Sequence, residues 1–211
     1  MSATERYFYQ PSEGHGLAHD PFNSIIAPRP IGWISSQDAD GRANLAPYSF
    51  FNAFNYHPPL IGFSSNGYKD SLRNIEQTQA FCWSLATRAL AEQMNISSAM
   101  VAHEVDEFEL AGLAKQAGKI INVPFVAQSP VAMECQLSDI VQLKSAGGKL
   151  CDSWLVIGEV VGVHIASELL HQGVYQTVKA EPVLRGGGPG DYFTLSEQLK
   201  FVMPRPQLPK D

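Results

Sequence analysis

A lysine and a serine flank the start of an expected helix at residues 69–78, KDSLRNIEQT. Asp70 and Ser71 are candidate caps, and a leucine and an isoleucine follow on one face. The start of a helix attracts anions through its unpaired N–H groups and its dipole, and Lys69 adds a positive charge. The pattern therefore fits a phosphate site, and it also fits a plain capped helix with a solvated lysine.

A second candidate surface is the run NLAPYSFFNA, Asn44 to Ala53, which mixes aromatic residues with serine, asparagine and a proline. Pro47 has no N–H group to donate to a β-ladder, so it predicts a strand edge or a bulge. Neighbouring main-chain groups would then be free to contact a planar ligand with polar edges. A bulge at a barrel rim that binds nothing is the alternative.

Other chemical motifs are weak. The sequence has no G-x-S-x-G, H-E-x-x-H or P-loop motif, which disfavours hydrolase and P-loop functions. His15 and His19, followed by Asp20, would share one face of a helix, but nearby glycines and a proline favour a polar arm, so we expect no metal site. The triple glycine at 186–188 either lets a backbone approach a ligand or forms a flexible loop.

Extended runs joined mostly by short turns predict the framework for these groups. The runs cover residues 24–36, a return strand with 44–53, and then 60–65, 81–86, 129–143 and 153–166. The turn residues of QDADGRAN predict a β-hairpin between the first two runs. Helices are expected at 69–78, at 87–99 with Thr87 as cap, and at 106–118, ending at glycine. This order favours a closed or partly closed antiparallel barrel over a parallel sheet.

Composition excludes several classes of function. With 211 residues, 45% of them hydrophobic, the chain can bury a core as one domain, and a net charge of −6 disfavours nucleic-acid binding. Cys82, Cys135 and Cys151 are far apart and form no C-x-x-C pair, so we expect buried thiols in a reducing cytoplasm. No apolar run approaches the length of a membrane span. We therefore expect a cytoplasmic protein with no nucleic-acid or membrane partner.

Five motifs follow one another along the chain: PRPIGWISSQDADGRANLAPYSFFNAFNYHPPLIGFSS, KDSLRNI, DEFELAGL, SPVAMECQL and GEVVGVHI. Together they resemble the flavin reductase-like family, including flavoredoxin-type proteins, over roughly Ser24 to Phe193. The resemblance implies a mainly β fold, an antiparallel FMN-binding split barrel with Greek-key-like topology and a few peripheral α-helices. Because residues 1–20 are polar and aperiodic, we expect an N-terminal arm there and a single split-barrel domain at 21–211.

The resemblance also implies which residues bind FMN. The ring would lie against the second strand, with main-chain groups of Asn44 to Tyr48 at its polar edge, and Lys69 would lie near the phosphate. The full expected set is Arg29, Pro30, Trp33, Ser35, Asn44, Leu45, Ala46, Pro47, Tyr48, Ser49, Phe50, Ser64, Ser65, Lys69, Ser71 and Asn74. His164 matches a family histidine near the nicotinamide and is the expected catalytic residue; a hydrogen-bonded core or interface histidine is the alternative. Arg185 and Tyr192 match a family Arg-Gly-Gly…Tyr segment with looser spacing.

The implied activity is hydride transfer from NADH or NADPH to flavin, which requires ring stacking and charge stabilisation rather than an acid–base pair. The resemblance further implies a homodimer with FMN in an interface cleft, and a monooxygenase or other redox protein as acceptor. An FMN-containing electron carrier of the flavoredoxin type, without its own nicotinamide site, is the alternative. A barrel that has lost its cofactor is disfavoured by the intact NLAPYS run and the Lys69–Ser71 pair.

Overall fold

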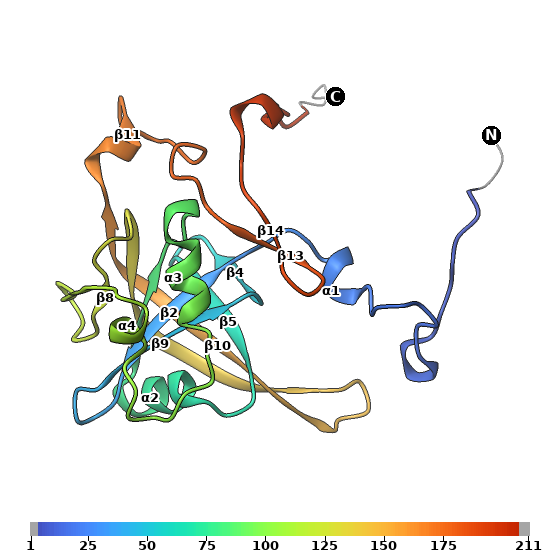
Figure 1. Cartoon of the computed structure of the whole chain (residues 1–211), viewed down its shortest axis with the longest axis horizontal. Helices are drawn as coiled ribbons and strands as arrows, with labels where there is room; N and C mark the ends of the chain where they lie inside the picture. Colours follow the sequence, from blue (N-terminus) through green and yellow to red (C-terminus); the bar gives the residue numbers. More distant parts are fainter. Residues whose placement is uncertain (1–3, 207–211) are drawn as a thin grey trace, which may run out of the picture.

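The computed structural model describes residues 4–206 and is built on one curled, seven-stranded antiparallel sheet. The strand order is β3-β2-β6-β9-β10-β5-β4. These strands are β2 (Gly32–Gln37), β3 (Ala43–Tyr48), β4 (Phe51–Asn55), β5 (Leu60–Asn66), β6 (Ala80–Ser84), β9 (Val131–Lys144) and β10 (Leu150–Ile165). The curl brings β3 and β5 into contact without pairing, so the sheet forms a split antiparallel barrel (Figure 1).

Smaller elements surround the sheet. The α-helices are α1 (Phe22–Ile25), α2 (Asp70–Thr78), α3 (Ala91–Ile96) and α4 (Glu107–Leu110), and the 3-10 turns are η1 (Pro11–Glu13), η2 (Arg88–Leu90), η3 (Ser167–Leu169) and η4 (Glu197–Leu199). A three-stranded sheet contains β1 (Arg29–Pro30), β13 (Leu184–Gly187) and β14 (Asp191–Phe193). Two short ladders pair β7 (Lys115–Gln116) with β8 (Phe125–Val126), and β11 (Leu170–His171) with β12 (Val174–Tyr175).

The sheet has a hydrophobic core on each face, because successive side chains of a strand point in opposite directions. Ile34 packs in the barrel interior with Phe63 and Phe81, whereas the preceding Trp33 packs in a second core with Phe108. This second core includes residues of α3 and α4. Both faces of β2 are thus buried, which makes it a rigid base for its edge neighbour β3.

The expected strands at 60–65, 81–86, 129–143 and 153–166 are confirmed as β5, β6, β9 and β10, and so is the edge position that Pro47 predicts. β2 and β3 form the expected hairpin, and β3 is an edge strand of the large sheet. The run 44–53, however, is not one strand: it forms β3, bends at residues 49–50, and continues as β4 at the opposite edge. The run therefore spans the opening of the split barrel.

Three expectations about individual elements are wrong. Residues 24–26 are not extended: α1 occupies residues 22–25, and the Asp20 side chain accepts the Phe22 N–H at its start. The region 87–99 is a 3-10 turn followed by α3, and Thr87 makes no side-chain capping bond. The third helix ends at residue 110 instead of 118, because Gly112 adopts a φ of +67° that cannot continue an α-helix.

Most of the N-terminal residues are exposed, and the three cysteines differ in burial. Residues 4–20 are mostly exposed and extend away from the barrel (Figure 1). Cys82 and Cys135 are buried free thiols, as expected, whereas Cys151 is only half-buried at the start of β10. Within residues 4–206, no helix is long and apolar enough to cross a membrane.

Candidate functional site

A cavity of about 500 Å³ lies beside the free edge of β3. Its wall combines β3 and the following bend with β5, the start of α2 and the loop after α3. The lining residues are Asn23, Asn44, Ala46, Pro47, Tyr48, Ser49, Phe50, Ser64, Asn66, Lys69, Asp70, Ser71, Ser97, Ser98, Ala99, Met100, Val101 and Glu107. Elements far apart in sequence therefore meet around one opening, which is lined by both polar and apolar groups.

The position of Pro47 in the ladder explains why a proline is tolerated there. The Leu45 N–H donates to Glu107 Oε2 at 3.1 Å, so it points away from the neighbouring strand. Antiparallel pairs alternate between hydrogen-bonded and non-hydrogen-bonded types, so Leu45–Ser35 and Pro47–Trp33 are both of the second type. A proline at this position removes no ladder hydrogen bond. The carbonyls of Leu45 and Pro47 also point outward, as acceptors along the free edge.

The start of α2 provides the cationic end of the cavity. Lys69 is the N-cap residue, and its ammonium group forms no ion pair within residues 4–206, so it is available to a ligand. Ser71 is almost fully buried and its Oγ accepts a hydrogen bond from Asn44 Nδ2 at 2.8 Å. That bond fixes the first turn of the helix against β3. The helix N-terminus and the strand edge are therefore held as one unit.

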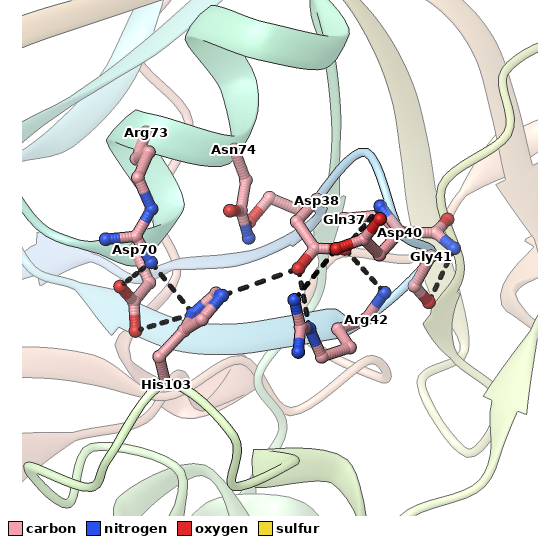
Figure 2. A network of polar contacts seen from close by, with 10 residues as sticks. Gln37, Asp38, Asp40, Gly41, Arg42, Asp70, Arg73, Asn74 and His103 are labelled. Carbon is pink, nitrogen blue, oxygen red and sulfur yellow. Dashed lines mark hydrogen bonds and ion pairs between the residues drawn. The ribbon is translucent and has the colours of Figure 1, made fainter.

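A polar network behind this helix end compensates the negative charge of Asp70 (Figure 2). Arg73 Nη2 donates to Asp70 Oδ1 at 2.5 Å and contacts His103 Nδ1 at 2.8 Å. His103 Nδ1 also lies 3.5 Å from Asp70 Oδ2, and its Nε2 lies 3.4 Å from Asp38 Oδ2. Asp38 also pairs with Arg42. This pairing lowers the pKa of Asp38, burial raises it, and the net result is a pKa of about 2. His103 thus links the loop after α3 to both the β2–β3 turn and α2.

Glu107 is a buried carboxyl group in the cavity wall, with only 7% of its surface exposed. It lies in the first turn of α4, where Asp106 caps the helix by accepting the Phe108 N–H. Burial raises the pKa of Glu107 above its ordinary value, and the hydrogen bond from the Leu45 N–H opposes that rise. The site therefore contains an acid whose ionisation is disfavoured by its surroundings.

A comparison with protein families assigns the chain to one of them. The model of the flavin reductase like domain matches residues 25–182. The chain belongs to the flavin reductase-like family. Family relatives include an uncharacterized protein of Aquifex aeolicus, 31% identical over 78% of this chain and 83% of its own length. Another, from Halalkalibacterium halodurans, is 31% identical over 87% of this chain and 88% of its own length.

Solved structures agree with this family assignment. Nitrilotriacetate monooxygenase component B from Bacillus cereus is 27% identical, with a TM-score of 0.81 over 95% of this chain and 98% of that one. The 2-nitrobenzoate 2-nitroreductase of Pseudomonas fluorescens is 28% identical, with a TM-score of 0.77 over 87% of this chain and 88% of that one. Flavoredoxin of Desulfovibrio vulgaris, at 23% identity and a TM-score of 0.72, shares the fold and covers 82% of this chain and 90% of that one.

The cavity brings together nine of the cofactor-binding residues expected for a flavin reductase-like protein. They are Asn44, Ala46, Pro47, Tyr48, Ser49, Phe50, Ser64, Lys69 and Ser71. Arg29 and Pro30 line a second cavity that shares Phe50 and Ser64 with the first. The expected β3 wall and the expected phosphate residues thus border the same space.

The other expected cofactor-binding residues lie behind this wall. Trp33 Nε1 donates to Ser97 Oγ at 2.9 Å, Ser35 Oγ donates to a backbone carbonyl at 2.6 Å, and Leu45 has its side chain in the core. Ser65 is buried and donates to the Gly67 carbonyl. Asn74 is also buried: Nδ2 donates to a serine at 3.3 Å, while Oδ1 has no partner within residues 4–206. Their contacts position the lining residues.

His164, the expected catalytic residue, does not line this cavity. Its Nε2 lies 2.6 Å from Glu134 Oε1, and its ring packs against Phe125. Burial raises the pKa of Glu134, but three backbone N–H groups of residues 119–121 and His164 outweigh it and hold that pKa at about 2. Within one chain, His164 is therefore the partner of a buried carboxylate.

The sequence did not indicate several parts of the cavity wall, among them Asn23, Asn66, Glu107 and the loop 97–101. Glu107 lies within the quoted motif DEFELAGL, but its inward orientation depends on the short α4. The loop 97–101 lines the cavity, but residues 97–99 were expected to be helical, so no loop was predicted there. A serine pair immediately after the last helical turn is the one local signal for that loop.

Proposed function

We propose that this chain binds FMN in the cavity beside β3 and acts as an NAD(P)H-dependent flavin reductase. One observation carries the proposal: a single cavity borders both the free edge of β3 and the cationic start of α2. A flavin mononucleotide has the matching two parts, a planar ring with polar edges and a phosphate. Membership of the flavin reductase-like family supports the same cofactor.

The residues present fit that cofactor. A volume of about 500 Å³ lies within the usual range for small-molecule sites, roughly 300–1,000 Å³. Lys69 supplies a positive charge, and the first N–H groups of α2 lack partners within the helix. Ala46 contributes only a methyl group to the wall, which leaves room for a ring against the strand. We therefore place the phosphate at Lys69 and the ring at Ala46.

The chain's own groups would bind and orient the ring. Glu107 already accepts the Leu45 N–H, so the free edge offers mainly the outward carbonyls of Leu45 and Pro47, which accept hydrogen bonds from ring N–H groups. Phe50 adds an aromatic side chain at the bend after β3. Bound FMN supplies the hydride chemistry between a nicotinamide and an acceptor. The protein's task in this proposal is to position the ring and to exclude water from one of its faces.

Assembly and acceptor belong to the same proposal. His164 lies outside the cavity of its own chain, so a role beside the nicotinamide requires a second copy, and we propose a homodimer. The Bacillus cereus relative is a monooxygenase component and the Pseudomonas fluorescens relative is a nitroreductase. We accordingly propose a monooxygenase, another redox protein or a small oxidised compound as the electron acceptor.

Two measurements on the purified chain test the proposal. Titration with FMN, followed by the visible absorbance and fluorescence of the flavin, should show saturable binding. Oxidation of NADH and of NADPH with excess FMN should then show turnover with at least one of them. Binding without turnover would favour an electron carrier that lacks its own nicotinamide site, and no binding would overturn the FMN assignment.

A further inference from the structure

Two arginines lie directly opposite each other on paired strands outside the large sheet. Arg29 of β1 and Arg185 of β13 are register partners in an antiparallel ladder, so their side chains leave the same face. Like charges at such positions repel each other and destabilise a sheet. The small sheet therefore holds two positive charges together in an arrangement that an anion would stabilise.

Neither arginine forms an ion pair within residues 4–206. Arg29 Nε donates to the Ser49 carbonyl at 3.2 Å, and its Nη1 donates to the carbonyls of Asn23 and Ile26. Arg185 donates three bonds of 2.8 Å to backbone carbonyls within residues 187–191. All these acceptors are neutral, so they fix the guanidinium groups without cancelling their charge.

Arg29 is the more constrained of the two, with only 8% of its surface exposed. Burial lowers the pKa of Arg29, and the charge of Arg185 lowers it further. Arg29 Nη2 has no hydrogen-bond partner in the described part of the chain, and neither does Arg185 Nε. Donors on both side chains remain available to a ligand.

A cavity of about 270 Å³ is lined by both arginines. Gly187, with a φ of +112°, lies in its wall and packs so closely on α1 that an added Cβ would be 2.7 Å from Ser24 Cα. The triple glycine thus allows close packing of the chain on itself. Asp20 is the acidic residue in the wall, and its Oδ1 is occupied by the Phe22 N–H at 2.9 Å.

This small cavity is adjacent to the proposed flavin cavity but separate from its cationic end. The two share Asn23 of α1 and Ser49 at the bend after β3, whereas Lys69 and Ser71 line only the larger one. The cofactor phosphate has its own cation at Lys69. A second anion site at the other end of the ring wall is therefore free for another molecule.

We propose that Arg29 and Arg185 bind a carboxylate or phosphate of the second substrate, the molecule that exchanges electrons with the flavin. The pair would hold that group at the bend after β3 and direct the rest of the molecule toward the ring. Arg29 Nη2 and Arg185 Nε would each donate to that group, and a lysine at either position would keep the charge without the fixed donor geometry of a guanidinium. This assignment rests on the proposed flavin function for the identity of the substrate, but not for the presence of an anion site.

Direct binding to the full-length chain tests the site without turnover. Isothermal titration calorimetry would use two probes, each with flavin-saturated and with flavin-free protein. Inorganic pyrophosphate represents the phosphates of a dinucleotide, and benzoate represents an aromatic carboxylate. In the flavin-saturated chain at least one probe should bind, and Arg185→Gln should weaken that binding by about tenfold or more. Arg185→Lys should recover only part of it. Arg88→Gln, an exposed arginine that lines neither of the two cavities, should change nothing.

The outcomes separate this proposal from the flavin assignment. Absence of probe binding to the wild-type chain, or equal binding by wild-type and Arg185→Gln proteins, would overturn the anion site. If Arg185→Gln weakens FMN binding as much as it weakens probe binding, and riboflavin binding is unaffected, the pair binds the cofactor phosphate instead. If the wild-type chain binds no FMN at all, the flavin proposal fails, whereas probe binding to the flavin-free chain still decides the anion site.

Discussion

Two buried glutamates in this molecule have opposite environments. Glu134 is completely buried and accepts three backbone N–H groups and His164, which hold its pKa at about 2. Glu107 is nearly as buried, accepts one N–H from another element and lines a cavity, and burial raises its pKa. The first carboxylate is fully satisfied by the chain, and the second is not.

The difference distinguishes polar groups that the chain itself satisfies from polar groups that can still bind a ligand. A carboxylate surrounded by donors stabilises the fold and has little capacity left for other chemistry. A carboxyl group at a cavity wall belongs to a different kind of site when, within residues 4–206, the strand edge beside it has unpaired carbonyls and a lysine without an ion pair. On this basis we propose the β3 cavity, rather than the Glu134–His164 pair, as the functional centre of a single chain.

The largest effect on stability is expected at Glu134. Glu134→Gln places an amide among three N–H donors, so we expect a loss of about 3 kcal/mol in the free energy of unfolding, as for other broken buried ionic contacts. Because the folded pKa lies below the ordinary value of 4.5, the stabilisation is present above about pH 4.5 and is lost as the pH falls toward 2. Urea unfolding between pH 3 and 7 measures both effects.

The matched control for this substitution is Glu159→Gln, which changes an exposed glutamate on β10. It should leave the unfolding free energy almost unchanged. FMN affinity of the folded Glu134→Gln protein should stay at the wild-type level, and a selective loss of affinity would move the functional centre toward His164.

The next largest effect should follow from filling the cavity. Ala46→Phe adds a ring where we place the flavin, so FMN affinity should fall by about tenfold or more. Ala53→Phe, at an exposed position of β4, serves as the control and should retain binding. Fluorescence titration with FMN measures both variants, and undiminished affinity in Ala46→Phe would contradict the placement of the ring.

The smallest effect is expected at Glu107. Glu107→Gln keeps an acceptor for the Leu45 N–H but removes a charge near a bound phosphate, so FMN affinity at pH 8 should rise about twofold to threefold. Since the folded pKa is raised, the stability that the neutral acid provides is lost as the pH rises through that pKa, and the glutamine variant should lack this loss. Glu109→Gln, exposed on the same helix, should show neither change.

Much of the fold was predictable because it depends on local signals. Pro47 correctly indicated an edge strand, and turn residues correctly placed the β2–β3 hairpin. The bounds of α2 agree with the expected helix at 69–78, but the expected caps are wrong: Lys69, not Asp70 or Ser71, is the N-cap residue, and no side-chain capping bond forms. Local signals failed where a single glycine decided the outcome, as at Gly112, which stops α4 after one turn.

The cavity wall was predictable only in part, because burial depends on tertiary packing. The alternation along β3 predicts which groups face outward once the edge is known, but not that Glu107 covers one of them. Nor does the sequence indicate that Arg29 and Arg185, more than 150 residues apart in the chain, are register partners. Such contacts arise only when the barrel closes.

The most direct test of the central claim compares FMN with riboflavin, which differ only in the phosphate. Both would be titrated into the wild-type chain, Lys69→Ala and the control Lys149→Ala, which removes an exposed lysine of the β9–β10 turn. We expect Lys69→Ala to weaken FMN binding by about tenfold and to leave riboflavin binding unchanged, because we place only the phosphate at Lys69. Equal losses for both ligands, or no loss for either, would contradict the assignment of ring and phosphate to this cavity.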